Sequence, residues 1–187
     1  HGRRFIYRTA HRRECDGTYI RRHRLCQGRL FGWALRRADC VFVQNAEDRA
    51  LLRRTVGVDA VHIPNAHRLD RAAEAPRRYI LWVGRSAAFK QPHLFIDLAR
   101  RMPDEQFVMI CQRATGDRTM QAVRDRAAQT PNLTLHEYVP FPQIDDWFAG
   151  ARALVNTSEA EGFPNTFIQA CKCGTPIVSL SVNPDDM

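Results

Sequence analysis

This sequence of 187 residues has very little lysine and no long apolar run. Its basic residues are arginines with two exceptions, Lys90 and Lys172, so each lysine is a candidate for a specifically placed charge. No apolar run approaches the roughly 18 residues that a membrane-spanning helix requires. The opening residues, HGRRFIYRTAHRR, contain neither a Met nor the apolar core of a signal peptide, and their abruptness predicts a fragment of a longer protein.

The six cysteines show no disulfide framework. Cys171 and Cys173 are separated by a single residue, which is too close for a zinc-binding CxxC pair. We therefore expect reduced thiols in a cytoplasmic protein. Two pairs of aspartates occur in the sequence. Asp145-Asp146 falls in a predicted helix, and the aspartates of residues 184–186 lie at the end of the sequence. Neither forms a visible Asp-rich metal site, and we therefore expect no metal dependence.

The net charge of +8 lies entirely in the N-terminal segment. Residues 1–40 hold eleven arginines against Glu14, Asp16 and Asp39, and the remaining residues hold 17 basic and 17 acidic groups. A basic segment can contact phosphate-bearing partners or an anionic membrane, or it can be a solvated arginine-rich face. We expect contact with an anionic surface and no nucleic-acid binding, because no known nucleic-acid-binding motif is present.

From Tyr79 onward, β-rich runs alternate with stretches of helical periodicity. The predicted strands are residues 79–83, 107–110, 133–135, 153–157 and 176–180, and the predicted helices are residues 92–101, 117–129, 143–151 and 165–173. This alternation predicts an α/β fold, with a Rossmann-like parallel sheet that carries helices on both faces.

An incomplete second α/β block precedes this pattern. Predicted strands at 38–45 and 60–65 flank an amphipathic helix at 46–57, which is too few strands for a doubly wound domain. The polar, Ala-rich residues 66–78 are typical of a linker. We therefore expect an incomplete domain over residues 1–65, a linker over 66–78 and a Rossmann-like domain over 79–187 that is truncated at its C-terminus.

Ligands of open parallel sheets bind beyond the carboxyl ends of the strands. The loops after the first and fourth predicted strands, residues 84–90 and 158–165, are the most polar and glycine-bearing, and we expect them to share one edge. Arg85 and Lys90 in the first loop suit a diphosphate, because Arg can bind two phosphate oxygens at once and Lys acts as a point charge. The alternative is that both are solvated loop residues.

The fourth loop leads into a helix that starts at residues 164–166. The first N–H groups of a helix lack intrahelical partners and form a site for an anion. Glu159 and Glu161 lie just before this helix start. A helix cap does not require them, and their carboxylates suit hydrogen bonds with the hydroxyls of a polyhydroxylated group. Gln169 lies one turn after Asn165 and can reach back to the same place, although Gln is also common in ordinary helices.

Together, GRSAAFK (84–90) and EGFPNTFIQACKCGTPIVS (161–179) resemble the C-terminal half of the group 1 glycosyltransferases, which are retaining nucleotide-sugar enzymes of GT-B fold. Their mark is Glu-x7-Glu within EGFP…EA…G-P-V-V. Here the frame runs from Glu161 to Gln169, followed by Ala170, Gly174, Pro176, Ile177 and Val178. ADCVFVQNAEDRALL and VHIPNA also resemble that family's crossing between its two domains, so the resemblance spans roughly the whole chain.

The resemblance implies a role for each site residue. Arg85 and Lys90 would hold the donor diphosphate and Glu161 would contact the transferred sugar, and these three are the expected catalytic residues. The expected donor-binding residues are Gly84, Gly162, Phe163, Pro164, Asn165, Thr166 and Gln169. Gln169 stands where the family has its second Glu, at the ribose hydroxyls, and it keeps an acceptor oxygen without the charge.

The implied reaction is transfer of a sugar from a nucleoside-diphosphate sugar to an acceptor hydroxyl, with retention and without a metal or other cofactor. Residues 1–65 would end the acceptor-side domain and residues 79–187 would bind the donor, and we expect the fragment alone to be inactive. The basic segment favours a lipid-linked acceptor and a peripheral position on the inner face of the membrane, in polysaccharide or glycolipid biosynthesis. Two alternatives stay open: another GT-B enzyme such as a sugar-nucleotide epimerase, and a non-catalytic nucleotide-binding module.

Overall fold

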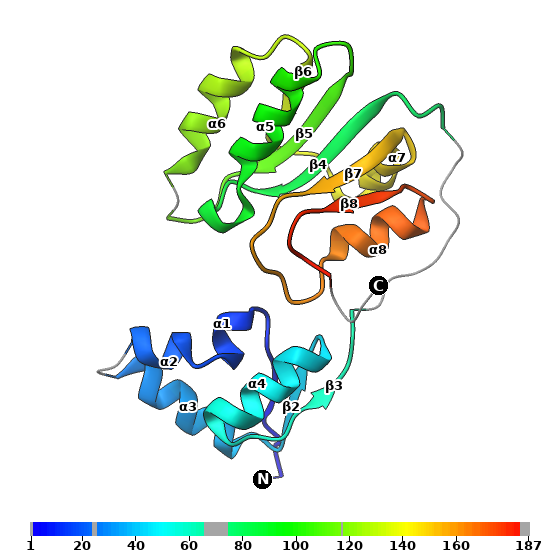
Figure 1. The fold of residues 1–187 in the computed structure, drawn as a ribbon. Helices are drawn as coiled ribbons and strands as arrows, with labels where there is room; N and C mark the ends of the chain where they lie inside the picture. The colour runs from blue at the N-terminus through cyan, green and yellow to red at the C-terminus, as the bar shows by residue number, and fades with distance from the viewer. Residues whose placement is uncertain (1, 24–25, 66–74, 117, 184–187) are drawn as a thin grey trace. The chain divides into compact units, whose positions relative to one another are not determined.

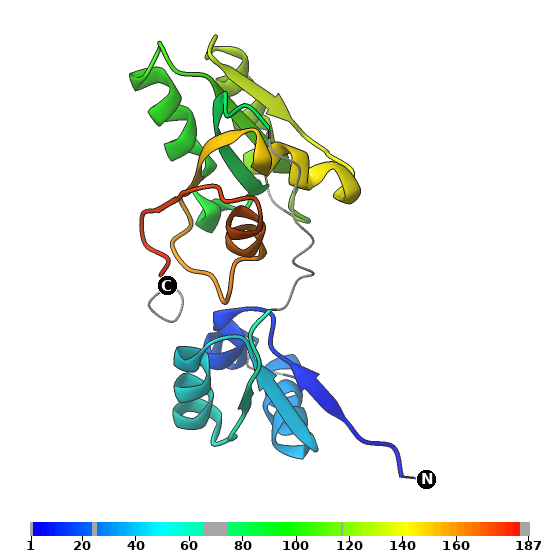
Figure 2. The ribbon, with the colours of Figure 1, turned by 90° about the vertical axis from the view of Figure 1, so that its right-hand side faces the viewer.

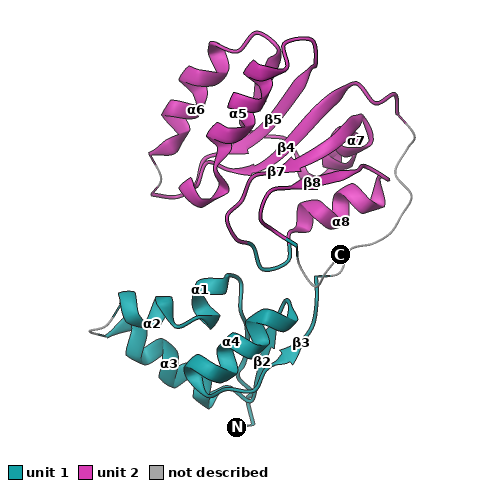
Figure 3. Ribbon diagram, in the orientation of Figure 1, with its two compact units in different colours: residues 1–66, 161–163, 183–187 teal, residues 67–160, 164–182 magenta. Residues whose placement is uncertain are grey.

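A computed structural model describes residues 2–23, 26–65, 75–116 and 118–183 of the chain. The chain divides into two compact units (Figure 3). Unit 1 comprises residues 1–66, 161–163 and 183–187, and unit 2 comprises residues 67–160 and 164–182. The predicted linker at 66–78 lies largely outside the described residues, and the domain boundaries expected from the sequence stay a prediction.

Unit 2 is built on a five-stranded parallel sheet in the order β6-β5-β4-β7-β8 (Figure 1). Its strands are β4 (Tyr79–Arg85), β5 (Phe107–Gln112), β6 (Leu133–His136), β7 (Ala151–Asn156) and β8 (Ile177–Ser179). The register places Leu81 of β4 beside Val108 of β5 and Leu154 of β7. All three side chains are buried, as expected for a parallel sheet that is covered on both faces.

Helices cover both faces of this sheet (Figure 1). Met109 of β5 packs with Phe95 and Val123 of two helices on one face, whereas its neighbour Val108 packs with Phe148 on the other, because successive strand residues point to opposite faces. The helical elements are η1 (Ala88–Lys90), α5 (Pro92–Arg101), α6 (Thr119–Ala128), η2 (Phe141–Gln143), α7 (Ile144–Ala149) and α8 (Asn165–Lys172).

Unit 1 contains a three-stranded parallel sheet with strands β1 (Ile6–Arg8), β2 (Cys40–Val43) and β3 (Val61–His62). Figure 2 shows the N-terminal residues extending beyond β1. Val41 and Val43 of β2 pack in one cluster with Leu35 and Leu52. The helices of the unit are α1 (Arg12–Cys15), α2 (Thr18–Arg22), α3 (Gln27–Arg37) and α4 (Ala46–Val56).

The α/β class and the parallel sheet with helices on both faces are confirmed. Several element boundaries differ from the prediction. The helix expected at 143–151 ends at Ala149, because Gly150 caps it and Ala151 pairs with Tyr79 as the first residue of β7. The segment before residue 38, for which no elements were predicted, forms a strand and three helices. No helix among the described residues is long and apolar enough to cross a membrane.

Candidate functional site in unit 2

The strand order of unit 2 creates a switch point between β4 and β7. From β4 the chain builds outward through β5 to β6 on one side, and it then returns to place β7 and β8 on the other side. Loops that leave neighbouring strands in opposite directions open a crevice at the carboxyl ends, where open α/β sheets bind ligands. The two loops singled out from the sequence follow these two strands, so their predicted common edge is confirmed.

A threonine at the end of β7 ties the two loops together. The indole Nε1 of Trp82 donates to the Thr157 hydroxyl oxygen at 2.9 Å. The hydroxyl proton of Thr157 can in turn be donated to the carbonyl oxygens of Lys90, at 2.7 Å, or Gln91, at 3.1 Å. Thr157 and Trp82 are both buried. The backbone around Lys90 is therefore fixed from the neighbouring strand.

Glu159 makes a second tie between these loops. Its backbone N–H donates to the carbonyl of Phe89 at 2.9 Å, and its carboxylate accepts from the Gln91 side-chain amide at 3.0 Å. Gln91 itself has a φ of 47°, in the left-handed region that non-glycine residues rarely adopt. The turn between η1 and α5 thus holds an unusual backbone conformation at the point where the two loops meet.

The two predicted phosphate-binding cations both lie on the first loop. Arg85 is the last residue of β4 and is exposed, and Lys90 is the last residue of η1. The Lys90 ammonium lies 5.4 Å from the centre of the Phe89 ring. Ser86 between them is fully buried, and its hydroxyl accepts from the backbone N–H of Ala114 at 3.0 Å. The start of the loop is therefore anchored while Arg85 projects from the strand end.

Gly84 has a packing reason to be glycine. A Cβ at this position would lie 2.8 Å from Cη2 of Trp82, closer than such atoms approach. The residue therefore lets the Trp82 indole lie against the strand and reach Thr157. Its contact with a ligand stays a prediction.

The helix α8 begins after Pro164, whose side chain has no acceptor to cap the first turn. Asn165 and Thr166 form that turn. Gln169 is only 6 % exposed and lies one turn after Asn165 on the same helix. At the other end of α8, the Lys172 ammonium pairs with Asp145 at 2.6 Å.

The remaining predicted residues, Glu161 to Phe163, group with unit 1. Within that unit the Gly162 carbonyl accepts from the Asn45 side-chain amide at 2.9 Å, and the Phe163 N–H donates to the side-chain oxygen of Gln44 at 3.3 Å. These contacts could not be predicted from local sequence patterns, because they join residues more than 110 positions apart.

Asp48 in the first turn of α4 is a buried carboxyl of unit 1. Its backbone N–H donates to the Asn45 side-chain oxygen at 2.7 Å, and its Oδ2 accepts from the Asn45 amide at 3.2 Å. Burial raises the pKa of Asp48 to about 6, against the opposing effects of the Asn45 hydrogen bond and the Arg12 charge. The group therefore titrates close to neutral pH.

Sequence reasoning missed Trp82, Thr157 and Gln91 as parts of the site's framework. Trp82 and Thr157 could have been noticed in the sequence. A tryptophan inside a buried strand and a threonine at the end of another both need hydrogen-bond partners. Gln91 carries no such signal, because nothing in the sequence marks a left-handed conformation at a glutamine.

Comparison with known proteins identifies the family of this chain and other proteins that share its fold. A family model described as "Glycosyl transferases group 1" matches residues 77–187. A D-inositol 3-phosphate glycosyltransferase of Paenarthrobacter aurescens (strain TC1) is 29 % identical over 137 residues, which cover 67 % of this chain and 34 % of that protein. The chain thus spans about a third of the length of this curated relative.

Solved structures share the fold at lower identity. A mutant of TarM from S. aureus, in complex with fondaparinux, alpha-GlcNAc-glycerol and UDP, has a TM-score of 0.73 and 15 % identity, over 95 % of this chain and 36 % of that one. Sucrose-phosphate synthase from Thermosynechococcus elongatus also has a TM-score of 0.73, with 18 % identity over 93 % of this chain and 49 % of that one. These neighbours have the GT-B fold.

Proposed function

Because the chain belongs to the group 1 glycosyl transferases, we propose that unit 2 binds a nucleoside-diphosphate sugar at the crevice between β4 and β7. The observation that carries the proposal is the switch point itself. It places Arg85 and Lys90 on a loop whose backbone is fixed by Thr157 and Glu159 of the neighbouring loop. Two cations on a rigid support suit a diphosphate, because little conformational entropy is lost when it binds.

The start of α8 supplies a second source of positive potential. The first-turn N–H groups at Asn165 and Thr166 lie at the positive end of the helix dipole. We assign them, with Pro164, to the donor, and we assign the side-chain amide of Gln169 to the ribose hydroxyls. Support for the Gln169 assignment is its position one turn after Asn165 on α8, from which the side chain can reach back toward the helix start.

The proposed reaction breaks the bond between the sugar and the diphosphate and forms a bond from the anomeric carbon of the sugar to an acceptor hydroxyl oxygen, with retention, while the hydroxyl proton passes to the departing diphosphate. The departing diphosphate would be stabilised by Arg85, Lys90 and the helix start, without a metal ion. Glu161 would contact the transferred sugar, with Gly162 and Phe163 beside it. UDP in the TarM complex is an example of a nucleotide bound to this fold. The acceptor we propose is lipid-linked, and the protein would act at the cytoplasmic face of a membrane.

Isothermal titration of the 187-residue chain with UDP tests the donor site. Lys90→Ala should weaken binding by about 1.5–3 kcal/mol, the range for a hydrogen bond to a charged group. Lys172→Ala removes the other lysine from the far end of α8 and is the matched control, which should bind UDP like the wild type. Unchanged affinity in Lys90→Ala would remove this residue from the site.

Excess EDTA tests the metal-free mechanism in the same titration. UDP binding should persist in the chelator, and a loss that Mg²⁺ or Mn²⁺ restores would contradict charge stabilisation by the protein alone. Hydrolysis of a UDP-sugar, measured beside binding, distinguishes an enzyme from a nucleotide-binding module.

A further inference from the structure

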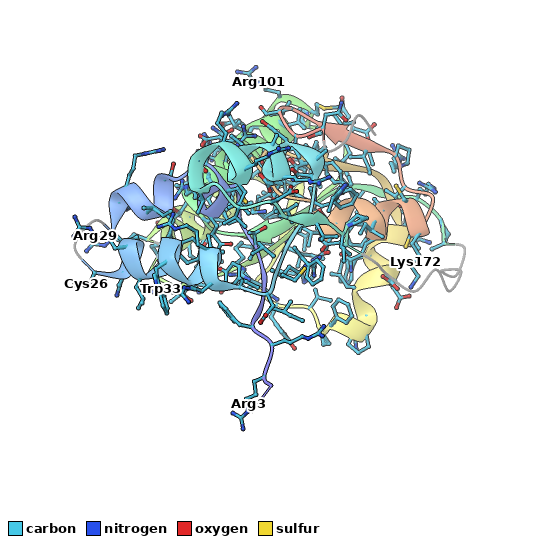
Figure 4. All side chains as sticks on the ribbon, turned by 90° about the horizontal axis from the view of Figure 1, so that it is seen from below. Arg3, Cys26, Arg29, Trp33, Arg101 and Lys172 are labelled. Carbon is cyan, nitrogen blue, oxygen red and sulfur yellow. The ribbon has the colours of Figure 1, made fainter. Side chains whose placement is uncertain are left out.

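The outer face of α3 in unit 1 carries large apolar side chains beside arginines. Leu30 is 63 % exposed and Trp33 is 55 % exposed, and Arg29 and Arg37 are exposed on the same helix. Arg29, Trp33 and Arg37 are spaced four residues apart, so they form one row along the helix surface. Figure 4 shows Arg29 and Trp33 on the outer side of α3. We call Arg29, Leu30, Trp33 and Arg37 the α3 face.

The helix cannot turn to bury this face. A Cβ on Gly28 would lie 2.4 Å from the Ile20 carbonyl oxygen, and one on Gly32 would lie 3.2 Å from Ile20 Cδ1. At Gly28 the inner side of α3 therefore has no room for a side chain, and at Gly32 it has little. Phe31 on that side also packs on the Tyr19 ring, with ring centres 4.8 Å apart. Trp33 is held outward by the packing of the opposite side of its own helix.

The chemistry of the α3 face fits an anionic lipid surface. Helices that lie on membranes combine Trp and Leu with cationic residues, and Trp favours the headgroup region because its ring is apolar and its N–H polar. The Arg37 guanidinium lies 5.8 Å from the Trp33 ring centre, so a cation and an apolar ring are presented together. Binding to nucleic acid would use the arginines but gives no role to an exposed leucine.

Exposed aromatic residues of unit 2 have a different setting. Tyr138 is 70 % exposed and Phe141 is 73 % exposed, but the nearby cations Arg124 and Lys172 are paired with Glu137 and Asp145. These aromatic residues therefore lack the accompanying excess of positive charge that an anionic surface favours. The charge of the surroundings, and not apolar exposure alone, therefore singles out the α3 face.

We propose that the α3 face docks unit 1 on membranes rich in anionic lipids. Trp33 and Leu30 enter the headgroup region, and Arg29 and Arg37 contact lipid phosphates. The docking is a binding property and does not depend on glycosyl transfer. It places a protein without a membrane-spanning helix in its described residues at a surface where lipid-linked acceptors occur.

Co-sedimentation of the full chain with phosphatidylcholine vesicles, with and without phosphatidylglycerol, tests this docking. We expect binding only where phosphatidylglycerol is present. Removing two cationic contacts in Arg29→Gln/Arg37→Gln should lower the partition coefficient about 30-fold. Leu30→Ala/Trp33→Ala should lower it at least roughly tenfold through lost apolar burial. Lipids with brominated acyl chains should quench tryptophan fluorescence in the wild type but not in Trp33→Phe.

Tyr138→Ala/Phe141→Ala is the matched control, and it should bind vesicles like the wild type. Circular dichroism confirms that each variant is folded. Equal binding of the wild type and Leu30→Ala/Trp33→Ala, or equal competition by heparin in both, would overturn the proposal in favour of a general polyanion surface. A dimer in sedimentation equilibrium that Trp33→Ala abolishes would instead assign the face to a second copy of the chain.

Discussion

The two units contain parallel sheets of the same kind but bury them differently. In unit 2, β5 alternates between two clusters, with Met109 on one side and Val108 on the other. In unit 1, Val41 of β2 packs into a single cluster, whereas Ile6 and Val61 on the neighbouring strands are 56 % and 49 % exposed. Unit 2 therefore carries its polar loop residues at the edge of a sheet that is covered on both faces. Unit 1 has an apolar sheet face that is not covered, and it carries the excess of arginine.

This difference predicts where each unit can tolerate change. A sheet with two covered faces loses stability when either face loses a large side chain, because each cluster contributes separately to burial. A sheet with one covered face tolerates truncation on its open side, since little apolar area is returned to water there.

The largest expected effect comes from opening a cavity on either face of the unit 2 sheet. The substitutions are Phe95→Ala in α5 and Phe148→Ala in α7. Each should cost about 3–5 kcal/mol of unfolding free energy, because both side chains are fully buried. Val61→Ala in unit 1 should change stability by less than about 0.5 kcal/mol. Urea denaturation followed by circular dichroism measures all three. The contrast between the units fails if Phe148→Ala costs no more than Val61→Ala.

The second prediction concerns Asp48, a buried carboxyl on α4 beside the hydrophobic cluster of unit 1. Its pKa is raised from 3.8 to about 6 in the folded chain, so folding favours the protonated acid. The stability it contributes is present below pH 4 and is lost as the pH rises to 6 and beyond. Asp48→Asn keeps an acceptor for Asn45 and should be roughly 1–3 kcal/mol more stable than the wild type at pH 8.

Urea denaturation of both proteins across the pH range checks this sign. The two stability curves should converge below pH 4 and separate between pH 4 and 6. A constant difference at every pH would mean that the substitution acts through packing and not through the charge of Asp48.

The smallest expected effect concerns Gln169 of α8 in unit 2. If it binds ribose hydroxyls, Gln169→Ala should weaken UDP binding by about 0.5–1.5 kcal/mol. Gln169→Glu should restore or strengthen binding, because a charged acceptor makes the stronger hydrogen bond and Arg85, Lys90 and the helix dipole offset its repulsion from the diphosphate. Isothermal titration measures both.

A 2′,3′-dideoxy analogue of UDP is the control ligand for that experiment. Wild type and Gln169→Ala should bind it equally, since it lacks the hydroxyls in question. If Gln169→Ala weakens both ligands by the same factor, the amide packs the helix and does not contact the ribose.

The sequence predicted unit 2 well because its elements are long enough to show their period. The strands of unit 2 and the helix at 92–101 were located to within about two residues. Unit 1 was harder. Helices α1 and α2 have four and five residues, which is too short for a periodic pattern. The inner face of α3 combines Gly28 and Gly32 with the apolar Phe31 and Leu35, and the outer face carries Leu30 and Trp33, so hydrophobicity alone does not distinguish the two sides.

The site was predictable only in part. A switch point follows from the order of strands, and the strand ends led to Arg85 and Lys90. The ties that hold the loop depend on long-range contacts, such as that of Thr157 with Lys90, which no local pattern encodes. The grouping of Glu161 with unit 1 has the same origin.

The ion pair between Lys172 and Asp145 has a practical consequence for chemical labelling. The chain has only two lysine side chains, and that of Lys172 is 15 % exposed and held by a carboxylate at 2.6 Å. Amine-selective acylation requires an accessible, deprotonated amine, so Lys172 should react slowly. Mass spectrometry of acylated peptides would then detect lysine modification mainly at Lys90. A nucleotide bound at the proposed site would lower the extent of acylation at this one residue.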